Sequence, residues 1–268
     1  MNDLLAASVL AGLFGLLIGS FLNVCISRLP HDYSVVTPGS HCPRCGAPIA
    51  WYDNIPLLSF LLLLGRCRAC RAPISLRYPL VEFSTGLLFF WVWWRTGGGW
   101  PGVKWCLFAA ILVELIVSDA ETRILPDEFT IGGIFAGLAL APVVPVPVGL
   151  IAWMWRMRVP DSTAALESFV HAAVSAALLS GGLWLMGAAY RKVRGREGLG
   201  FGDVKMTAFL GAFLGFETAL FALLAGSLLG TVLGLVWIRL RGAEVSSYEL
   251  PFGSFLGVGA LIAAASRL

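Results

Sequence analysis

Residues 4–27 read LLAASVLAGLFGLLIGSFLNVCIS, and none of these side chains carries a charge. A run of this length can cross the hydrocarbon core of a bilayer as one helix, which takes roughly 20 apolar residues. A secretory signal peptide can look similar, but Met1–Leu5 lacks the basic residues of one, and no small-residue cleavage site follows the apolar run. The stretch therefore predicts a first transmembrane helix that is retained in the protein.

The rest of the chain has the same apolar character. Of its 268 residues, 58% are hydrophobic and 13% are charged, and the mean hydropathy is +0.82. A soluble domain carries roughly 25% charged residues. We therefore expect an all-α polytopic membrane protein with about eight transmembrane helices, at residues 4–27, 79–95, 101–118, 129–155, 167–190, 204–217, 218–238 and 250–266. Pro142, Pro145 and Pro147 interrupt the fourth stretch, which is expected to kink or end early, so seven or nine helices remain open.

Basic residues are distributed unevenly between the two sides that eight spans define. With the N-terminus outside, the inner segments, together with Lys205 just past the boundary of one of them, hold 14 of the 19 lysines and arginines. These are Arg28, Arg44, Arg66, Arg68, Arg71, Arg77, Arg123, Arg191, Lys192, Arg194, Arg196, Lys205, Arg239 and Arg241. Because basic loops stay in the cytoplasm, this distribution predicts a multi-pass membrane protein whose N-terminus lies on the outer side. The net charge of +3 then reflects cytoplasmic loops and does not indicate a nucleic-acid partner.

Four cysteines lie in one loop between the first two expected helices. They form two CxxC pairs, and each pair opens the same phrase: Cys42-Pro-Arg-Cys45-Gly-Ala-Pro-Ile49 and Cys67-Arg-Ala-Cys70-Arg-Ala-Pro-Ile74. Two such knuckles are typical of a closed, tetrahedral, structural zinc site, whereas two disulfides are disfavoured on the reducing side of a membrane. His41 could replace one ligand, but Cys42, Cys45, Cys67 and Cys70 already suffice.

The same loop predicts a division of the chain into three parts. A loop of about 50 residues is too small to fold on an apolar core alone, and metal binding would supply the missing free energy. We expect the first helix at 1–27, a cytoplasmic zinc-binding domain at 28–78 and a membrane-embedded domain at 79–268. Cys25 and Cys106 lie in apolar stretches and are interpreted as small core residues.

Carboxylates that border apolar spans are energetically costly and are therefore candidates for function. In this chain they are Glu82, Glu114, Asp119, Asp127, Glu128, Asp203, Glu217 and Glu249. Asp119 ends the third expected span and Asp203 opens the sixth, so two complete spans separate them. An even number of spans places both carboxylates at the same membrane face, where they could form one site.

The sequence around Asp203 is rich in glycine, at Gly198, Gly200 and Gly202. Glycine permits backbone geometries that are closed to other residues, and it permits the close approach of a second chain such as a peptide substrate. The opposing interpretation is local, with Asp203 and Asp127 each acting as the N-cap of a helix. A phosphate-binding loop is a third and weaker interpretation, because no β-strand precedes the glycines.

Several short motifs together resemble one family. They are Gly19-Ser-Phe-Leu-Asn-Val24, Arg28-Leu-Pro30, the paired CxxC loop, Arg77-Tyr-Pro-Leu-Val-Glu82, Asp119 through Pro126-Asp127, Gly200-Phe-Gly202-Asp203-Val-Lys205 and Pro251-Phe-Gly253. The combination covers nearly the whole chain and is similar to the type IV prepilin peptidases. These are GxGD-type intramembrane aspartic proteases, and they act as leader peptidases and N-methyltransferases in pilus assembly and type II secretion. The resemblance implies that Asp119 and Asp203 are the catalytic pair.

The resemblance also implies a substrate and a methyl donor. The family removes a short basic leader from prepilins and pseudopilins at the cytoplasmic side, after a glycine, and then methylates the new N-terminal amine with S-adenosylmethionine. The sequence shows no βαβ pattern from which a binding site for this donor could be derived. Glu82, at the start of the second expected span and directly after the zinc loop, is our candidate contributor to methyl transfer. A carboxylate paired with Arg77 or Lys205 is an equal alternative for it. Gly200, Gly202 and Lys205 are the other candidate supporting residues.

Two other classes of protein remain open, together with a peptidase that lacks methyltransferase activity. A transporter would bind protons or ions with carboxylates near the middle of the membrane, for which Glu114 and Glu217 are the best candidates. Asp119 and Asp203 are instead expected at the membrane edge. A membrane scaffold would use the zinc loop to dock a partner, which leaves the glycine-rich segment before Asp203 unexplained.

Overall fold

Residues 2–146, 149–195, 198–241 and 250–268 are described by the structure, a computed structural model. Pro147, Arg196 and Glu249, which are named above, lie outside these residues. Across the described ranges the chain is helical and forms two isolated β-bridges but no strand. The elements are α1 (Asn2–Arg28), η1 (Leu29–His31), η2 (Trp51–Asn54), α2 (Leu58–Leu62), α3 (Arg77–Thr96), α4 (Gly99–Thr122), α5 (Asp127–Leu140), α6 (Leu150–Arg158), α7 (Ala164–Arg194), α8 (Phe201–Leu214), α9 (Phe216–Arg241) and α10 (Phe252–Ala265).

The chain divides into two compact units, Met1–Glu114 and Leu115–Leu268, and the boundary between them falls within α4. The loop with the four cysteines belongs to the first unit, and Asp119 and Asp203 both belong to the second. The expected parts at 1–27, 28–78 and 79–268 were divided by their roles and not by compactness. That division stays a prediction.

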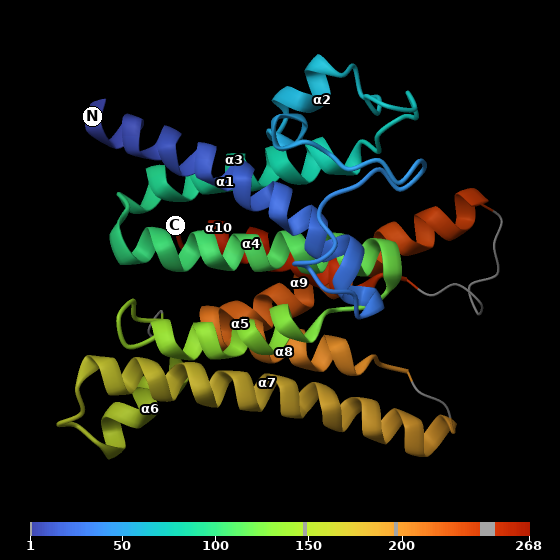
Figure 1. The fold of residues 1–268 in the computed structure, drawn as a ribbon. Coiled ribbons are helices and arrows are strands. Elements are labelled where there is room, and N and C mark those ends of the chain that lie inside the picture. The colour runs from blue at the N-terminus through green and yellow to red at the C-terminus, as the bar shows by residue number, and fades with distance from the viewer. Residues whose placement is uncertain (1, 147–148, 196–197, 242–249) are drawn as a thin grey trace. The chain divides into compact units, whose positions relative to one another are not determined.

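In the first unit, α1 lies along α3 (Figure 1). Glycines of α1 face α3 so closely that a Cβ on Gly19 would come within 2.7 Å of the Cα of Glu82, and a Cβ on Gly15 would also clash with α3. Small residues let helix backbones approach, which is how many helices associate in a membrane. Asn23 adds a hydrogen bond from its Nδ2 to the carbonyl of Tyr78, at 3.0 Å.

In the second unit, α8 is the central helix, with α5 and α7 beside it (Figure 1). Every side chain from Met206 to Leu214 of α8 is buried. Gly211 meets the backbone of α7, where a Cβ would come within 2.7 Å of Ala176. Helices α9 and α10 pair in the same manner, through Gly226 and Gly259. Asp203 is therefore carried by a helix whose later turns are densely packed in the unit.

Three helices among the described residues are long and apolar enough to cross a membrane, over Asn2–His31, Ala164–Arg194 and Phe216–Val236. The described residues thus confirm the expectation of a helical protein, and these three helices have the length and composition of membrane spans. Helices α3, α4, α5, α8 and α10 overlap the other expected spans. The number of eight spans stays a prediction.

The fourth expected stretch, residues 129–155, ends early, which is one of the two outcomes that its prolines predicted. Helix α5 ends at Leu140, and a separate helix, α6, begins at Leu150. Proline has no N–H group for a helical hydrogen bond, so neither Pro142 nor Pro145 can continue the hydrogen bonding of α5. Pro142 and Pro145 follow the end of α5, and the stretch is broken there instead of kinked.

Candidate active site

The four cysteines of the first unit converge as the two repeats predict. Their Sγ atoms all lie within 4.8 Å of one another, and Cys42 Sγ is 3.9 Å from Cys70 Sγ. Sulfur ligands around a tetrahedral zinc ion stand roughly 3.8 Å apart, given Zn–S bonds of about 2.3 Å. All four are free thiols, and Nδ1 of His41 lies 3.0 Å from the carbonyl of Gly39. The cluster could therefore hold a metal ion through its four cysteines without this histidine.

The backbone of the two knuckles repeats as the sequence does. The N–H of each leading cysteine, Cys42 and Cys67, donates to the carbonyl five residues later, at 2.9 and 2.8 Å. Gly46 and Arg71 occupy equivalent positions with positive φ, at 71° and 60°. An arginine in this conformation is strained relative to glycine. The second knuckle thus keeps the geometry of the first at some energetic cost.

The sulfur atoms are close enough to affect one another's protonation. Hydrogen bonds from the backbone of Arg44 and Cys45 lower the pKa of Cys42 to about 6. A backbone hydrogen bond from Ala47 lowers the pKa of Cys45, but the side chain of Cys70, burial and the side chain of Cys42 together raise it to about 11. Four thiolates at this spacing need a neighbouring cation, which a bound metal ion would supply.

Asp119 lies in the last turn of α4 and is 5% exposed. Its Oδ2 accepts two hydrogen bonds from Ser254, one from the backbone N–H at 2.7 Å and one from the hydroxyl at 2.9 Å. Burial raises the pKa of Asp119, while the hydrogen bonds from Ser254 and the charge of Arg123 oppose the rise. Donors of this kind stabilise the ionised form of a carboxylate.

Asp203 is the third residue of α8, which begins after the N-cap Gly200. Burial and then the charge of Asp119 raise the pKa of Asp203 to about 7, against the opposing effect of a backbone hydrogen bond with Gly200. Both aspartates lie outside the three helices that are long and apolar enough to cross a membrane. The two carboxylates thus differ. Asp119 has hydrogen-bond donors that stabilise its ionised form, and Asp203 has a raised pKa that favours its protonated form.

The glycines before Asp203 provide space, and the expectation of unusual backbone angles is wrong. None of Gly198, Gly200 and Gly202 has a positive φ, and Gly200 lies at −70°. A Cβ on Gly202 would come 3.3 Å from the side chain of Leu125, and one on Gly200 would come 3.3 Å from Oδ2 of Asp203. The close approach seen here is made by side chains of the chain itself, and that of a peptide substrate stays a prediction.

Neither aspartate that was considered as a helix N-cap has this role. The N-cap of α5 is Pro126, without a side-chain cap, and Asp127 is the first helical residue. Asp127 instead forms an ion pair, from its Oδ1 to Nζ of Lys205 in α8. The N-cap of α8 is Gly200, three residues before Asp203. Lys205 therefore links the start of α5 to the first turns of α8 and supports the position of Asp203.

Glu82 of α3 is engaged by the loop of the first unit. Its Oε2 accepts a hydrogen bond from the N–H of Leu57, at 2.9 Å. Leu57 has a φ of 59°, which is costly for a leucine and needs support from surrounding contacts. Lys205, an alternative partner for Glu82 in the sequence analysis, has Asp127 as its ion-pair partner. Glu82 therefore has a structural contact that explains its burial.

Glu217, a candidate of the transporter interpretation, has a local contact at the start of α6. Its Oε1 accepts a hydrogen bond from the N–H of Leu150, at 2.5 Å, and its side chain is 42% exposed. The first N–H groups of a helix lack partners within the helix. A partly exposed carboxylate that satisfies one of them needs no role in transport.

Ser254 is the site residue that the sequence analysis missed. It follows the motif Pro251-Phe-Gly253, which was noted as part of the resemblance, but no local pattern connects it with Asp119, 135 positions earlier. Gly253 permits the contact, since a Cβ there would come 3.1 Å from Cγ of Asp119. The motif could have drawn attention to this segment, but its contact with Asp119 could be seen only in the folded structure.

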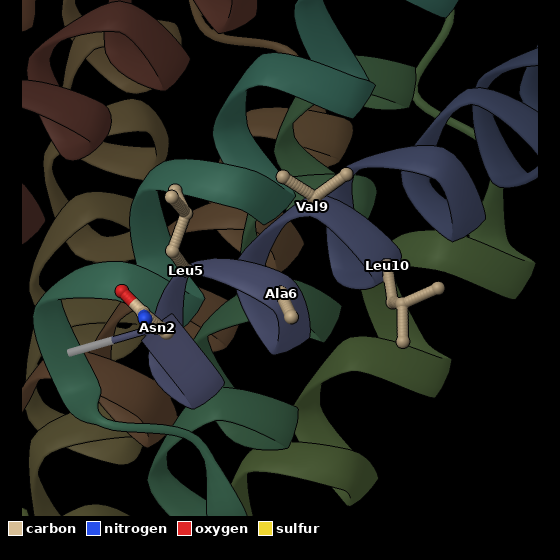
Figure 2. A pocket seen from close by; sticks show the side chains of 5 residues that line it. All are labelled: Asn2, Leu5, Ala6, Val9 and Leu10. Atoms are coloured by element: carbon tan, nitrogen blue, oxygen red, sulfur yellow. The ribbon is translucent and has the colours of Figure 1, made fainter.

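A shallow pocket on the first unit is lined by none of these groups (Figure 2). Its lining residues come from the first turns of α1 and are mostly apolar: Asn2, Leu5, Ala6, Val9 and Leu10. All of them except Asn2 belong to the first expected membrane span, residues 4–27. We interpret this pocket as lipid-facing surface and not as a substrate site.

Comparison with known proteins identifies the class that these features define. Residues 13–96 match the bacterial peptidase A24 N-terminal domain, and residues 106–235 match the type IV leader peptidase family. The first match contains the loop with the four cysteines, and the second contains both Asp119 and Asp203. The chain belongs to the type IV leader peptidase family.

Several relatives carry the name prepilin leader peptidase/N-methyltransferase. The protein of Myxococcus xanthus is 42% identical over 228 residues, which are 85% of this chain and 62% of that protein. The protein of Pseudomonas aeruginosa is 35% identical over 274 residues, which cover 94% of this chain and 87% of that one. The protein of Neisseria gonorrhoeae is 34% identical, with 87% and 83% covered. No solved structure matches the chain.

Proposed function

We propose that this chain removes the basic leader from type IV prepilins or pseudopilins, with Asp119 and Asp203 as its catalytic pair. The observation that supports the proposal most strongly is the asymmetry of the two carboxylates. Asp119 accepts two hydrogen bonds on Oδ2, and burial together with the charge of Asp119 raises the pKa of Asp203 to about 7. Near neutral pH, one carboxylate can be ionised while the other holds a proton.

This asymmetry assigns a role to each aspartate. Ionised Asp119 takes a proton from a water molecule as the water oxygen attacks the scissile carbonyl carbon, and protonated Asp203 donates to the carbonyl oxygen. When the tetrahedral intermediate collapses, the C–N bond breaks and the leaving amine takes the proton from Asp119. Asp203 recovers its own proton from the gem-diol as the carbonyl re-forms. No covalent intermediate is required, so reagents that modify a nucleophilic serine should leave cleavage intact.

The proposal includes N-methylation of the new N-terminal amine, with S-adenosylmethionine as the methyl donor. This part is supported by the names of the relatives. Glu82, the candidate contributor, accepts a hydrogen bond from the N–H of Leu57, and this contact fits an anchor of the loop better than a donor-binding group. We therefore derive no step of methyl transfer from the residues of the site. In the same proposal the metal ion of Cys42, Cys45, Cys67 and Cys70 is a structural zinc.

A cleavage assay separates this function from its alternatives. Purified chain in detergent or nanodiscs is incubated with a prepilin that has a basic leader, a glycine at the cleavage position and a phenylalanine after it. Mass spectrometry should show the leader released after the glycine and, with S-adenosylmethionine added, a methyl group on the new N-terminus. Cleavage without methylation would indicate a peptidase alone, and no cleavage by folded, zinc-loaded protein would leave the transporter and scaffold interpretations.

The proposed orientation places the N-terminus in the periplasm and the aspartates at the cytoplasmic face of the inner membrane. A reporter fused after Arg28 or Arg196 should read as cytoplasmic, and one fused after Arg158 should read as periplasmic, because most basic residues flank the first two positions. Reporters with activity on each side of the membrane provide the measurement. A periplasmic signal after Arg196 would remove the argument that the aspartates share one face.

A further inference from the structure

Ser254 makes three short polar contacts from the first turn of α10. Its N–H donates to Oδ2 of Asp119 at 2.7 Å, and its Oγ lies 2.9 Å from the same oxygen. The same Oγ lies 2.8 Å from the carbonyl oxygen of Ile116, which precedes Asp119 by one turn of α4. Ser254 is 8% exposed. The hydroxyl is therefore placed between two acceptors in a nearly water-free position.

A serine hydroxyl has one hydrogen, so it can donate to only one of these two oxygens at a time. When it donates to Asp119, the carboxylate is ionised, and its Oδ2 receives two hydrogen bonds. When the hydroxyl donates to Ile116, it has no hydrogen left for Asp119. The 2.9 Å contact is then a hydrogen bond only if Oδ2 of Asp119 is protonated and donates to Oγ of Ser254. Both arrangements use the same positions of the heavy atoms.

The backbone N–H of Ser254 biases this pair of states. It belongs to the first turn of α10, where N–H groups have no partner within the helix and the helix dipole favours a negative charge. Ser254 N–H donates to Oδ2 in either arrangement, so the oxygen is fixed while the hydroxyl hydrogen turns. Gly253 leaves room for this contact, as a Cβ there would press on Cγ of Asp119.

We propose that Ser254 is a positioning residue whose hydroxyl holds Asp119 in place in both of its protonation states, donating to the ionised carboxylate and accepting from the protonated one. The inference rests on the proposed function, in which Asp119 gains a proton from water and loses it again in each cycle. By turning between Asp119 and Ile116, the hydroxyl lets this cycle proceed without moving the carboxylate or leaving a buried polar atom unpaired.

Ser254→Ala removes the hydroxyl and keeps the backbone donor, so its effect should appear in the pH dependence of cleavage. Both forms of Asp119 lose a hydrogen bond, but the one to the ionised carboxylate is the stronger, so the pKa of Asp119 should rise. Cleavage requires ionised Asp119 and is lost as pH falls through that pKa, so the acid limb should move to higher pH, by about one unit. The kcat at the optimum should fall about tenfold with little change in KM, because the hydroxyl is engaged by Asp119 and Ile116.

Three further variants make the experiment decisive. Ser254→Thr retains a hydroxyl and should restore the acid limb toward the wild-type position. Ser254→Cys has a similar volume with a weak donor, so it should shift the limb in the same direction as Ser254→Ala even if the alanine variant folds poorly. Ser266→Ala is the matched control, because the hydroxyl of Ser266 belongs to the C-terminal end of α10 and donates to Ala263 at 2.7 Å. Its profile should equal that of the wild type.

The outcomes for Ser254 and for the proposed function can be told apart. If wild-type protein cleaves the prepilin and Asp119→Asn does not, the proposed function stands whatever Ser254 does. An unchanged acid limb in folded Ser254→Ala and Ser254→Cys would then overturn the inference about Ser254. If Ser254→Thr and Ser254→Ala shift equally, the effect comes from packing, and the inference also fails.

Discussion

Asp203→Asn is expected to lower the rate of leader cleavage by about 10³-fold, within the range that acid–base catalysis contributes. An asparagine has almost the same volume as the aspartate but no transferable proton. In the proposed reaction, Asp203 supplies the proton that the scissile carbonyl oxygen takes as water attacks. The measurement is the initial rate of leader release by mass spectrometry, in protein shown to be folded by its thermal unfolding profile and its zinc content.

The matched control for this variant is Asp127→Asn. It makes the same chemical change at an exposed carboxylate whose ion pair with Lys205 is partly open to solvent. Exposed pairs of this kind contribute about 0.2–1 kcal/mol to stability, so a far smaller loss of cleavage is expected. Pre-cleaved pilin offers a second control, since methylation should survive in Asp203→Asn. Substantial cleavage by folded Asp203→Asn would contradict the proposed mechanism.

The second large effect is expected from removal of the metal. Wild-type protein should carry about one zinc ion per chain, and Cys42→Ser or Cys67→Ser should lower the zinc content and the stability of the loop together. A structural zinc contributes on the order of 10 kcal/mol to the folding of a small domain, which the loop has little apolar core to replace. Zinc is measured by elemental analysis, and loop stability by limited proteolysis.

Cys106→Ser is the matched control, because Cys106 is a buried free thiol of α4 outside the cluster. Its zinc content should equal that of the wild type. Because the metal is proposed to be structural, a cysteine variant whose folding is rescued should retain some cleavage. Unchanged zinc in a variant with serine at Cys42, Cys45, Cys67 and Cys70 would rule out this metal site.

Sequence patterns predicted those features that depend on local chemistry. Most expected spans correspond to helices, because an apolar stretch in lipid must satisfy its own backbone hydrogen bonds. The two cysteine phrases predicted two matching knuckles, since equal sequences around a tight turn form equal hydrogen bonds. The parity of spans between Asp119 and Asp203 predicted their common membrane face, which stays a prediction. The structure places the two residues close enough for their charges to interact.

Features that depend on distant contacts were not predictable in this way. The hydrogen bonds of Ser254 to Asp119 join helices that are far apart in the sequence. Asp127 looked like a helix cap because it follows a proline at a helix start, but an ion pair with Lys205 holds its side chain. The glycine-rich segment before Asp203 predicted that some other group approaches it closely. It did not show that this group is Leu125 and other side chains of the same chain.

The central claim is that Asp119 and Asp203 act as one pair, and the double variant Asp119→Asn/Asp203→Asn tests it most directly. Residues that act as a unit show strongly non-additive losses, because the first substitution already removes the shared function. The rate of prepilin cleavage is measured for the wild type, both single variants and the double variant under identical conditions. We expect each single variant to lose about 10³-fold and the double variant to retain the same residual rate as either single variant. A double variant whose loss equals the product of the two single losses, or a single variant with near wild-type cleavage, would contradict the claim.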